Sequence, residues 1–274
     1  MKIVCWIGDS PNHWALVQKL AAEFEIVGIV IDRKSKSSSK LSLRKILEKG
    51  LDITVFRSIS NAWFKLQFYY KNKFPDRTGF NCFYGDSINT KSAFDFTIKC
   101  QPDLIVVSGT SIVKSPMIEI PSRLGILNLH TGLSPYIKGG PNCTNWCISN
   151  NQWGLIGNTI MWLSKGIDSG NIIASEKVDV IKEKNLYDIH LRVMESAHDL
   201  YLRSVRYVGS GVSSFQSVPQ ASLGKGNLYL NRMWSWRKKM KLLQNIKSKR
   251  EQGISGDVIT ISLPTSVNSV NLSS

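Results

Sequence analysis

The chain has 274 residues, of which 42% are hydrophobic, and it carries a formal net charge of +15. This length can bury a full core, and the composition is typical of a soluble globular protein rather than a disordered or fibrous one. No apolar run approaches the roughly 20 residues that cross a bilayer, and the short N-terminal run is typical of a buried strand rather than a signal peptide. We therefore expect a cytoplasmic protein with no transmembrane segment, whose positive charge favours phosphate-bearing partners.

The N-terminal residues predict a β-α-β unit. Residues 2–8 form an apolar run, residues 12–23 carry apolar side chains at helical spacing, and residues 26–31 form a second run. Such a unit implies two parallel strands joined by a right-handed crossover, with ligands collecting at the carboxyl ends of the strands. The turn at residues 8–12 is thus a candidate phosphate or ribose contact, although it lacks the Gly-x-Gly-x-x-Gly dinucleotide pattern.

The next elements alternate in the same way. A Ser/Lys-rich connection over 33–44 and a short helix to about residue 48 precede a predicted third strand at 53–56. Helices are expected over 60–73, where we place the aromatic side chains in the core, and over 90–99. The apolar run 104–108 predicts another strand, which ends in the turn Gly109-Thr110-Ser111.

The segment 125–135 is the most informative part of the chain. Alternation along a strand places Asn128 and His130 on the same side, and Gly and Pro then end the strand. Asp168, in the Gly-Ile-Asp-Ser-Gly turn at 166–170, can complete a polar trio. An amide donor, an imidazole and a carboxylate suit acyl transfer, which stabilises an oxyanion and moves protons. The alternative is structural, since a single histidine at a strand end more often only satisfies local hydrogen bonds.

The second half of the chain predicts further α/β structure and an appendage. Residues 141–150 should be helical with Trp146 inward, 159–163 and 172–178 should form antiparallel strands, and 186–207 should form a long amphipathic helix. The expected fold is α/β, a doubly wound, mostly parallel sheet with a small C-terminal extension. We place a catalytic domain at 1–208, a C-terminal module with a basic helix at 209–250, and a disordered tail at 251–274.

Two further features concern cysteines and basic residues. The five cysteines form no disulfide or metal-binding spacing, so we expect free thiols and no metal site. Residues 225–250 contain nine Lys or Arg and no acidic residue. This run is interpreted as a basic helix packed on the main domain; the alternative is a membrane-surface or nucleic-acid element on a degenerate core, which would make the chain a binding protein.

Three motifs together resemble the folate-dependent formyltransferases. They are Asn128-Leu-His130-x-x-Leu-Ser-Pro, Gly157-Asn-Thr159 and Gly166-Ile-Asp168-Ser-Gly. The resemblance implies a Rossmann-type core and formyl transfer from N10-formyltetrahydrofolate, with Asn128, His130 and Asp168 as the catalytic residues. His130 could donate to the oxyanion or accept the amine proton. The chain departs from the family at Met161, where many members carry a histidine.

The resemblance also implies where the folate donor binds. It places the donor near the strand end at 106–111 and the loop at 164–168, and the cofactor contacts that it implies are Val106, Ser108, Thr110, Ile112, Ser164 and Gly166. The alternative is that the apolar residues among them belong to the sheet core.

Three acceptors compete within this family. The resemblance is greatest to sugar-nucleotide N-formyltransferases, through chain length, the 135–142 loop and the Lys-Gly-Asn-x-Tyr segment at 225–229. It implies a dTDP- or GDP-linked amino-deoxysugar acceptor, in surface polysaccharide (lipopolysaccharide O-antigen) synthesis. The substrate contacts are then Ser10, Asn12, Tyr136, Lys138 and Gly139. Glycinamide ribonucleotide and methionyl-tRNA are the alternatives. A homodimer is allowed, and nucleic acid is not expected as a partner.

Overall fold

A computed structural model describes residues 1–33, 50, 54–140, 142–211, 216–248 and 258–264. Its strands are β1 (Lys2–Gly8), β2 (Glu25–Asp32), β3 (Cys82–Gly85), β4 (Leu104–Ser108), β5 (Gly125–His130), β6 (Ile137–Gly139), β7 (Gly157–Trp162), β8 (Ile172–Lys177) and β9 (Asn227–Tyr229). Its α-helices are α1 (Pro11–Ala21), α3 (Arg57–Lys73), α4 (Lys91–Lys99), α5 (Cys143–Ser149), α6 (Leu186–Gly209) and α7 (Trp236–Ser248). Single 3-10 turns occur at Met117–Glu119, Trp153–Leu155, Gln220–Ser222 and Asn231–Met233.

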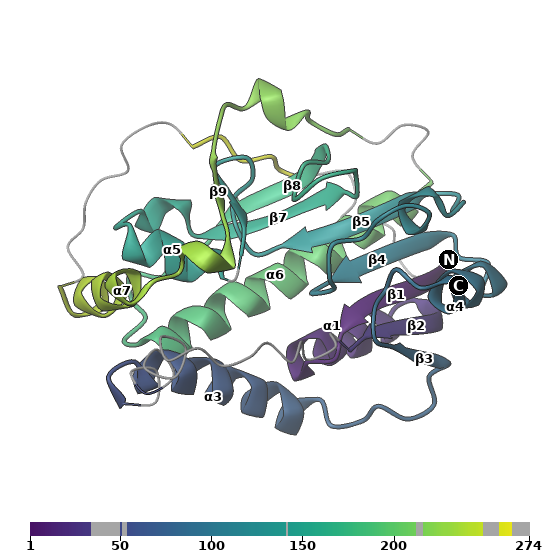
Figure 1. The fold of residues 1–274 in the computed structure, drawn as a ribbon. Helices are drawn as coiled ribbons and strands as arrows, with labels where there is room; N and C mark the ends of the chain where they lie inside the picture. Colours follow the sequence, from purple (N-terminus) through teal and green to yellow (C-terminus); the bar gives the residue numbers. More distant parts are fainter. Residues whose placement is uncertain (34–49, 51–53, 141, 212–215, 249–257, 265–274) are drawn as a thin grey trace, which may run out of the picture.

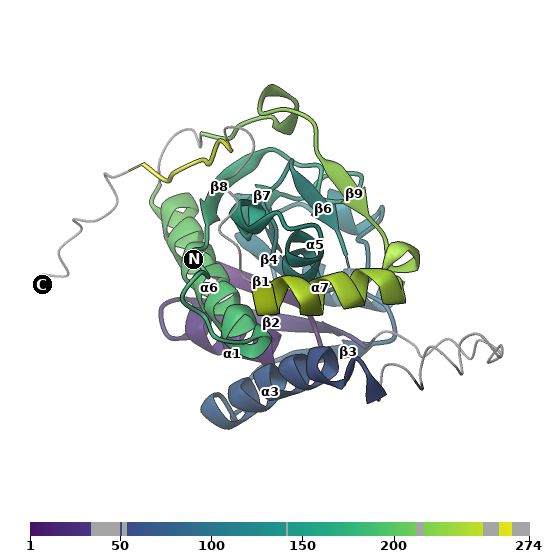
Figure 2. The ribbon, with the colours of Figure 1, turned by 90° about the vertical axis from the view of Figure 1, so that its left-hand side faces the viewer.

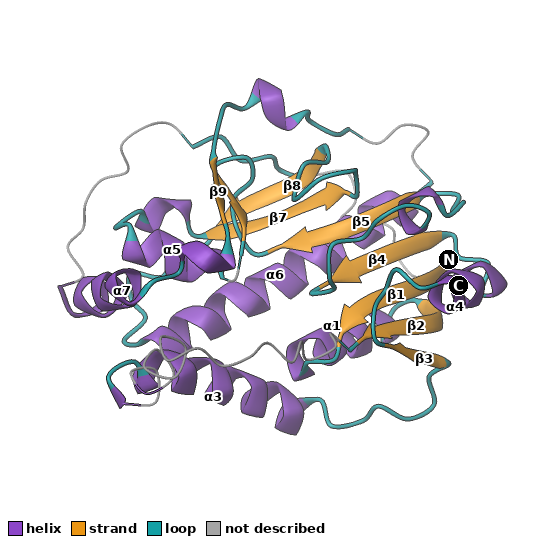
Figure 3. Ribbon diagram, viewed as in Figure 1, coloured by secondary structure: helices purple, strands orange, loops and turns teal. Residues whose placement is uncertain are grey.

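Seven strands form one sheet in the order β3-β2-β1-β4-β5-β7-β8 (Figure 3). The neighbours from β3 to β5 are parallel, whereas β7 and β8 each run antiparallel to the preceding strand. A second, two-stranded sheet pairs β6 with β9. The predicted α/β fold with a doubly wound, mostly parallel sheet is therefore confirmed.

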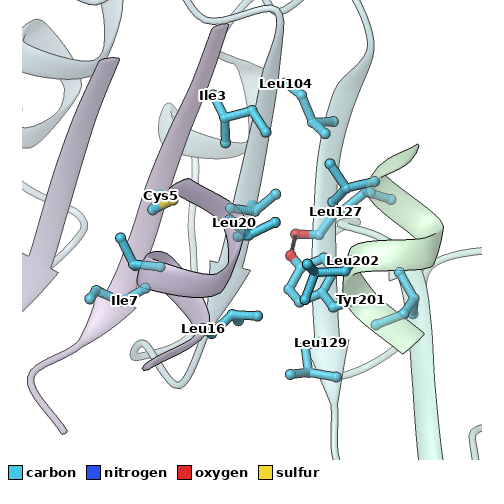
Figure 4. Packing of buried hydrophobic residues seen from close by; sticks show 14 of the residues in the cluster. Ile3, Cys5, Ile7, Leu16, Leu20, Leu104, Leu127, Leu129, Tyr201 and Leu202 are labelled. Carbon is cyan, nitrogen blue, oxygen red and sulfur yellow. Dashed lines mark hydrogen bonds between the residues drawn. The ribbon is translucent and has the colours of Figure 1, made fainter. Parts of the chain in front are cut away.

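The helices cover both faces of the large sheet (Figures 1 and 2). Along β1, Ile3, Cys5 and Ile7 face the cluster that contains α1 and α6, while Val4 and Trp6 face the cluster on the α4 side. A strand covered on both faces is apolar on both, which explains the continuous hydrophobic run. The buried packing of β1, β4 and β5 against α1 and α6 is seen in Figure 4.

Local signals fix the starts of several helices. Pro11 occupies the first turn of α1, where its missing N–H costs nothing. The Thr90 hydroxyl accepts a hydrogen bond from the Ala93 N–H at the start of α4, and Asn185 accepts one from the Asp188 N–H at the start of α6. The predicted helices over 12–23, 60–73, 90–99, 141–150 and 186–207 are confirmed in position, with ends that differ by a few residues.

The predicted third strand at 53–56 was wrong. Thr54, Val55 and Phe56 form helix and turn that lead into α3, and Ile53 lies outside the described residues. Periodicity cannot separate so short an apolar run from the edge of a helix. The strand beside β2 is instead β3, which the sequence analysis missed. The predicted connection at 33–44 and the helix to residue 48 lie outside the described residues, apart from Arg33.

Three of the five aromatic side chains of α3 that we placed in the core are exposed, whereas Tyr70 is fully buried. Trp63, Phe64 and Phe68 are 40%, 70% and 56% exposed. α3 contacts α1 and α6 through a narrow stripe, Ala62, Leu66 and Tyr70, spaced four residues apart. Burial therefore follows that stripe rather than aromatic content.

The described residues after α6 pack onto the rest of the chain. Helix α7 lies against α5, with Leu242 fully buried and the Ser149 hydroxyl donating to the Lys238 carbonyl at 2.9 Å. The described part of the basic run thus includes a helix that packs against α5. Residues 258–264, within the predicted disordered tail, lie along β8, where Ile261 and Ser175 are joined by hydrogen bonds of 2.8 and 3.0 Å. The remainder of that tail lies outside the described residues. No helix in the described part of the chain is long and apolar enough to cross a membrane.

Candidate active site

A cavity of about 800 Å³ opens at the carboxyl ends of β4 and β5. Its lining comes from five segments that are distant in sequence: residues 107 and 109–113, 128–130, 139–140, 163 and 166–168, and 229–232. The last segment follows β9, which crosses beside the end of β5 in Figure 1. The cavity therefore lies where ligands of parallel α/β sheets bind, and its wall includes residues of the C-terminal extension.

Asn128, His130 and Asp168 all line this cavity. On β5, Leu127 and Leu129 join the core cluster of α1 and α6, so alternation turns the amide and the imidazole the other way. Asp168 reaches the cavity from the loop between β7 and β8. The structure thus brings together the three residues that the sequence predicted as a trio.

The imidazole of His130 is held between two acceptors. Its Nδ1 lies 3.3 Å from Asp168 Oδ2, and its Nε2 lies 3.0 Å from the carbonyl oxygen of Ile137. The Cys143 sulfur lies 3.6 Å from the same Nε2. Gly132 leaves room for the ring, because a Cβ at that position would lie 2.6 Å from Nε2. Two oxygen acceptors on opposite ring nitrogens favour the doubly protonated imidazolium.

Burial and neighbouring groups shift the pKa of His130 in opposite directions. Burial lowers the pKa, but the Asp168 carboxylate, the Cys143 sulfur and the Ile137 carbonyl raise it, and the net effect is an increase to about 10. At neutral pH the ring is therefore a hydrogen-bond donor and an acid. Of the two roles left open by the sequence, donation to a developing oxyanion fits this state.

Asp168 is fixed by its own loop and by β6. Its backbone is left-handed, with φ of +47°, a conformation that Asp tolerates better than most residues. Its Oδ2 accepts a hydrogen bond of 2.9 Å from the Gly139 N–H in addition to facing His130. Within the loop, the hydroxyls of Ser164 and Ser169 are 2.9 Å apart.

The Asn128 side chain differs from its two neighbours. It is half-buried at the cavity wall, and no hydrogen bond joins its amide to another of the residues that the structure describes. Its N–H groups are thus free to meet a ligand oxygen.

The other predicted contacts divide into two groups. Thr110, Ile112, Gly139 and Gly166 line the cavity. Val106 and Ser108 are buried in β4 beside Tyr201, and the Ser164 hydroxyl is engaged with Ser169. These three are not among the residues that line it.

Of the predicted substrate contacts, Gly139 lines the cavity, whereas Ser10, Asn12, Tyr136 and Lys138 lie outside its lining. Asn12 is 1% exposed, with its amide directed to the Met194 sulfur, and Ser10 precedes α1. The Tyr136 hydroxyl donates to the Leu223 carbonyl at 3.3 Å and accepts from the Ile259 N–H at 3.0 Å. Lys138 is on β6, opposite Leu228 of β9.

Sequence reasoning missed the lining residues 229–232 and the backbone partners of the trio. The Lys-Gly-Asn-x-Tyr segment was noted for its resemblance, but nothing in it signalled that the residues directly after it reach the site. Among the lysines and arginines that the structure describes, Arg232 alone lines the cavity. The backbone groups of Ile137 and Gly139 carry no sequence signal. Among the described residues, no group of three or more His, Cys, Asp or Glu is arranged to hold a metal ion.

The sequence matches a known family over its central part. Residues 73–205 match the model of the family described as formyl transferase. Curated relatives include methionyl-tRNA formyltransferases from Clostridium tetani, 29% identical over 42% of this chain and 36% of the relative, and from Clostridium botulinum, 31% identical over 77% and 60%. The matched part of the chain thus spans less than two thirds of the length of these relatives.

Solved structures share the fold at low identity. A sugar N-formyltransferase from Shewanella sp. is 16% identical, with a TM-score of 0.56 over 89% of this chain and 88% of that one. Glycinamide ribonucleotide transformylase 1 from Symbiobacterium toebii is 16% identical, with a TM-score of 0.54 over 80% and 93%. An N-formyltransferase from Helicobacter canadensis, solved with folinic acid and dTDP-3-aminofucose, is 12% identical, with a TM-score of 0.56 over 91% and 83%.

Proposed function

We propose that this chain, whose residues 73–205 match the model of the formyl transferase family, moves a formyl group from N10-formyltetrahydrofolate to an amine. The observation that carries the proposal is the meeting of Asn128, His130 and Asp168 at one cavity of about 800 Å³. Each supplies something that acyl transfer needs: a free amide donor, a protonated imidazole and the carboxylate that keeps it protonated.

The cavity has the chemistry that a folate donor needs. Ile112, Val113 and Leu163 form an apolar side, and Ile112 remains 56% exposed there. The turns at 109–111 and 166–167 add backbone polar groups. A flat heteroaromatic ring with edge donors and acceptors fits such a combination of apolar wall and polar turn.

The reaction forms a bond between the amine nitrogen and the formyl carbon and breaks the bond from that carbon to N10. The amine loses a proton and N10 gains one. Asn128 donates an N–H to the formyl oxygen as its negative charge grows. His130 adds a second donor from the imidazolium when the ligand displaces one of its present acceptors. Asp168 holds the ring in its orientation and keeps its charge.

For the acceptor, we propose the amine of a nucleotide-linked amino-deoxysugar. Arg232 brings an exposed cation to the cavity wall, where it can meet the diphosphate of such a substrate. The likeness to the Shewanella sugar N-formyltransferase extends over most of both chains, including part of the region after α6. That region forms β9 and one wall of the cavity, so an acceptor that uses it is favoured over one that does not.

Methionyl-tRNA is the second candidate acceptor. The observation in its favour is that curated methionyl-tRNA formyltransferases are 25–31% identical to this chain over the matched parts, whereas the solved structures named above are 12–16% identical. The exposed basic side chain of Arg232 is compatible with an RNA backbone as well as with a diphosphate. The two candidates therefore need a direct comparison.

The test is a spectrophotometric assay of tetrahydrofolate release with a panel of acceptors. The panel contains dTDP- and GDP-linked amino sugars, glycinamide ribonucleotide and methionyl-tRNA, and the Asn128→Ala and Asp168→Asn variants are run beside the wild type. We expect turnover with an amino sugar and a large but measurable fall in kcat in both variants. Turnover with methionyl-tRNA alone would assign the second candidate, and no turnover with any amine would refute formyl transfer.

Arg232→Gln separates the acceptor from the donor. We expect it to raise the KM for the nucleotide-sugar acceptor by about tenfold, the effect of one lost charge-assisted contact, and to leave the donor KM unchanged. Arg237→Gln, an exposed position on α7 that does not line the cavity, is the matched control. An increase confined to the donor KM would instead place Arg232 beside the folate.

A further inference from the structure

The segment that follows α6 returns to the edge of β8, directly after the loop that carries Asp168. Val218 and Ile172 exchange two backbone hydrogen bonds, of 2.8 and 2.9 Å. Ile172 is the first residue of β8 and lies four positions after Asp168. The C-terminal extension is thus anchored to the strand that begins where the catalytic loop ends.

Two residues after this anchor, Gln220 inserts its side chain beneath the loop. Its Nε2 donates to the carbonyl oxygens of Asp168 and Gly170, at 2.8 and 2.7 Å. The residue is only 8% exposed, and the same amide nitrogen lies 3.7 Å from the Met161 sulfur on β7. Both hydrogens of the amide are therefore used on the backbone of the loop, at the catalytic residue and two positions beyond it.

The same extension also reaches Asp168 from its other side. The Asp168 carboxylate accepts the Gly139 N–H, and Gly139 belongs to β6, which pairs with β9 of the extension. The Tyr136 hydroxyl, next to β6, donates to the Leu223 carbonyl. Both the backbone and the carboxylate of Asp168 are thus held by structure that depends on residues 216–229.

We propose that Gln220 is a positioning residue for Asp168, so that residues beyond 208 form part of the catalytic site rather than a separate appendage. This inference rests on the proposed function, in which Asp168 orients and charges His130. Asp168 has a left-handed backbone, which few non-glycine residues hold without support. The two hydrogen bonds from Gln220 supply that support at the carbonyl of Asp168 itself and at that of Gly170.

The test replaces the donor and keeps the volume. Gln220→Met retains an unbranched side chain of similar length but has no N–H, and Gln220→Glu is isosteric but places oxygen atoms against two carbonyls. Gln216→Met, at an exposed glutamine in the same segment, is the matched control. We expect both Gln220 variants to lower kcat by about 10- to 100-fold, as a small misplacement of a catalytic group does, with both KM values within about twofold of wild type.

A double-mutant cycle and a resonance measurement separate positioning from general loss of structure. If Gln220 acts through Asp168, then Gln220→Met has no further effect on kcat in an Asp168→Asn background. The NMR titration of the His130 ring should move to lower pH in Gln220→Met and stay unchanged in Gln216→Met. Additive effects in the cycle, or a wild-type kcat and titration in Gln220→Met, would overturn the proposal.

The titration also keeps the two claims distinct. If the wild type transfers no formyl group to any acceptor, the proposed function fails, but the response of His130 to Gln220→Met still tests the link from Gln220 to Asp168. If the wild type is active and the His130 titration does not respond, the positioning role fails while formyl transfer stands. Gln220→Glu provides the same titration where Gln220→Met does not fold.

Discussion

The Nδ1 atom of His130 lies 3.3 Å from a carboxylate oxygen of Asp168, and the ring nitrogen on the other side lies 3.0 Å from the carbonyl oxygen of Ile137. A neutral imidazole has one donor and one acceptor and would leave one of these contacts unfavourable. The imidazolium satisfies both. The contact between His130 and Asp168 therefore favours a positively charged imidazolium, rather than a neutral general base, at the wall of the cavity.

This charge sets the pH dependence of activity. The pKa of His130 is raised to about 10, so we expect kcat to hold from neutral pH into the alkaline range and to fall only as the ring loses its proton there. Asp168→Asn keeps a side chain that tolerates the left-handed backbone but removes the charge. The fall should move to lower pH in that variant. An identical alkaline limb in wild type and variant would contradict the assignment of the imidazolium as the active form.

The same pair makes a pH-dependent contribution to the free energy of unfolding. The folded pKa of about 10 exceeds the ordinary value of 6.5, so the stabilisation is fully present below about pH 6.5 and is lost as the pH rises through 10. Urea unfolding of wild type and Asp168→Asn, measured across this range, isolates the pair from other alkaline titrations. We expect the stability difference between the two proteins to shrink toward high pH. A constant difference would contradict the raised pKa.

Asn128 should act on the transition state rather than on binding. Its amide has no partner among the described residues, so its removal leaves no buried group unsatisfied and should barely change stability. Loss of one oxyanion donor costs about 10² to 10³ in kcat. We expect Asn128→Ala to show that loss with little change in either KM, and Asn171→Ala, at an exposed asparagine, to behave as wild type. A rise in KM with unchanged kcat would assign Asn128 to ground-state binding.

The strands of the sheet could be predicted from the sequence where their apolar runs were long. Continuous apolar runs identified β1, β2 and β4, because a strand covered on both faces has few polar positions. The short segments failed: Val55 and Phe56 precede α3, whereas the equally short Cys82–Gly85 forms β3. Which of two brief runs joins a sheet depends on the space beside β2, and that information is not local.

The candidate site was predictable only in its side chains. Alternation on β5 placed Asn128 and His130 together, and the family resemblance added Asp168. The partners that tune them are the backbone groups of Ile137 and Gly139 and the amide of Gln220, which is 52 positions from Asp168. Backbone atoms leave no residue-type signal, and a single glutamine in a loop has no periodicity. The electrostatics of the trio therefore required the structure.

Gly139 lies in the two-stranded sheet of β6 and β9, and its N–H donates to Asp168 of the site. This position should not tolerate a side chain. Its φ is +87°, and an added Cβ would lie 2.1 Å from the Tyr229 carbonyl oxygen, so β6 and β9 must separate in Gly139→Ala. Because the Gly139 N–H also holds Asp168, we expect kcat to fall together with stability, which should drop by more than about 1 kcal/mol. Gly79→Ala has a similar φ of +77° and open space, so it measures the backbone cost alone. Equal effects of the two substitutions on kcat would contradict the role of the contact.

Tyr201 should stabilise the sheet at the base of the site through its hydroxyl. The hydroxyl donates to the Leu127 carbonyl at 2.7 Å and accepts from the Val107 N–H at 2.8 Å, so it joins β4 to β5 from within α6 (Figure 4). The side chain is fully buried, and Tyr201→Phe leaves both backbone groups without that partner and without water. We expect the free energy of unfolding to fall by about 1–3 kcal/mol, the cost of leaving buried polar groups unpaired, measured by urea denaturation. Tyr84→Phe, at a tyrosine that is 46% exposed, controls for loss of a hydroxyl as such. Leu127 and Val107 adjoin Asn128 and the cavity wall, so kcat should fall together with stability in Tyr201→Phe. A variant as stable as wild type would show that β4 and β5 keep their spacing without this hydroxyl.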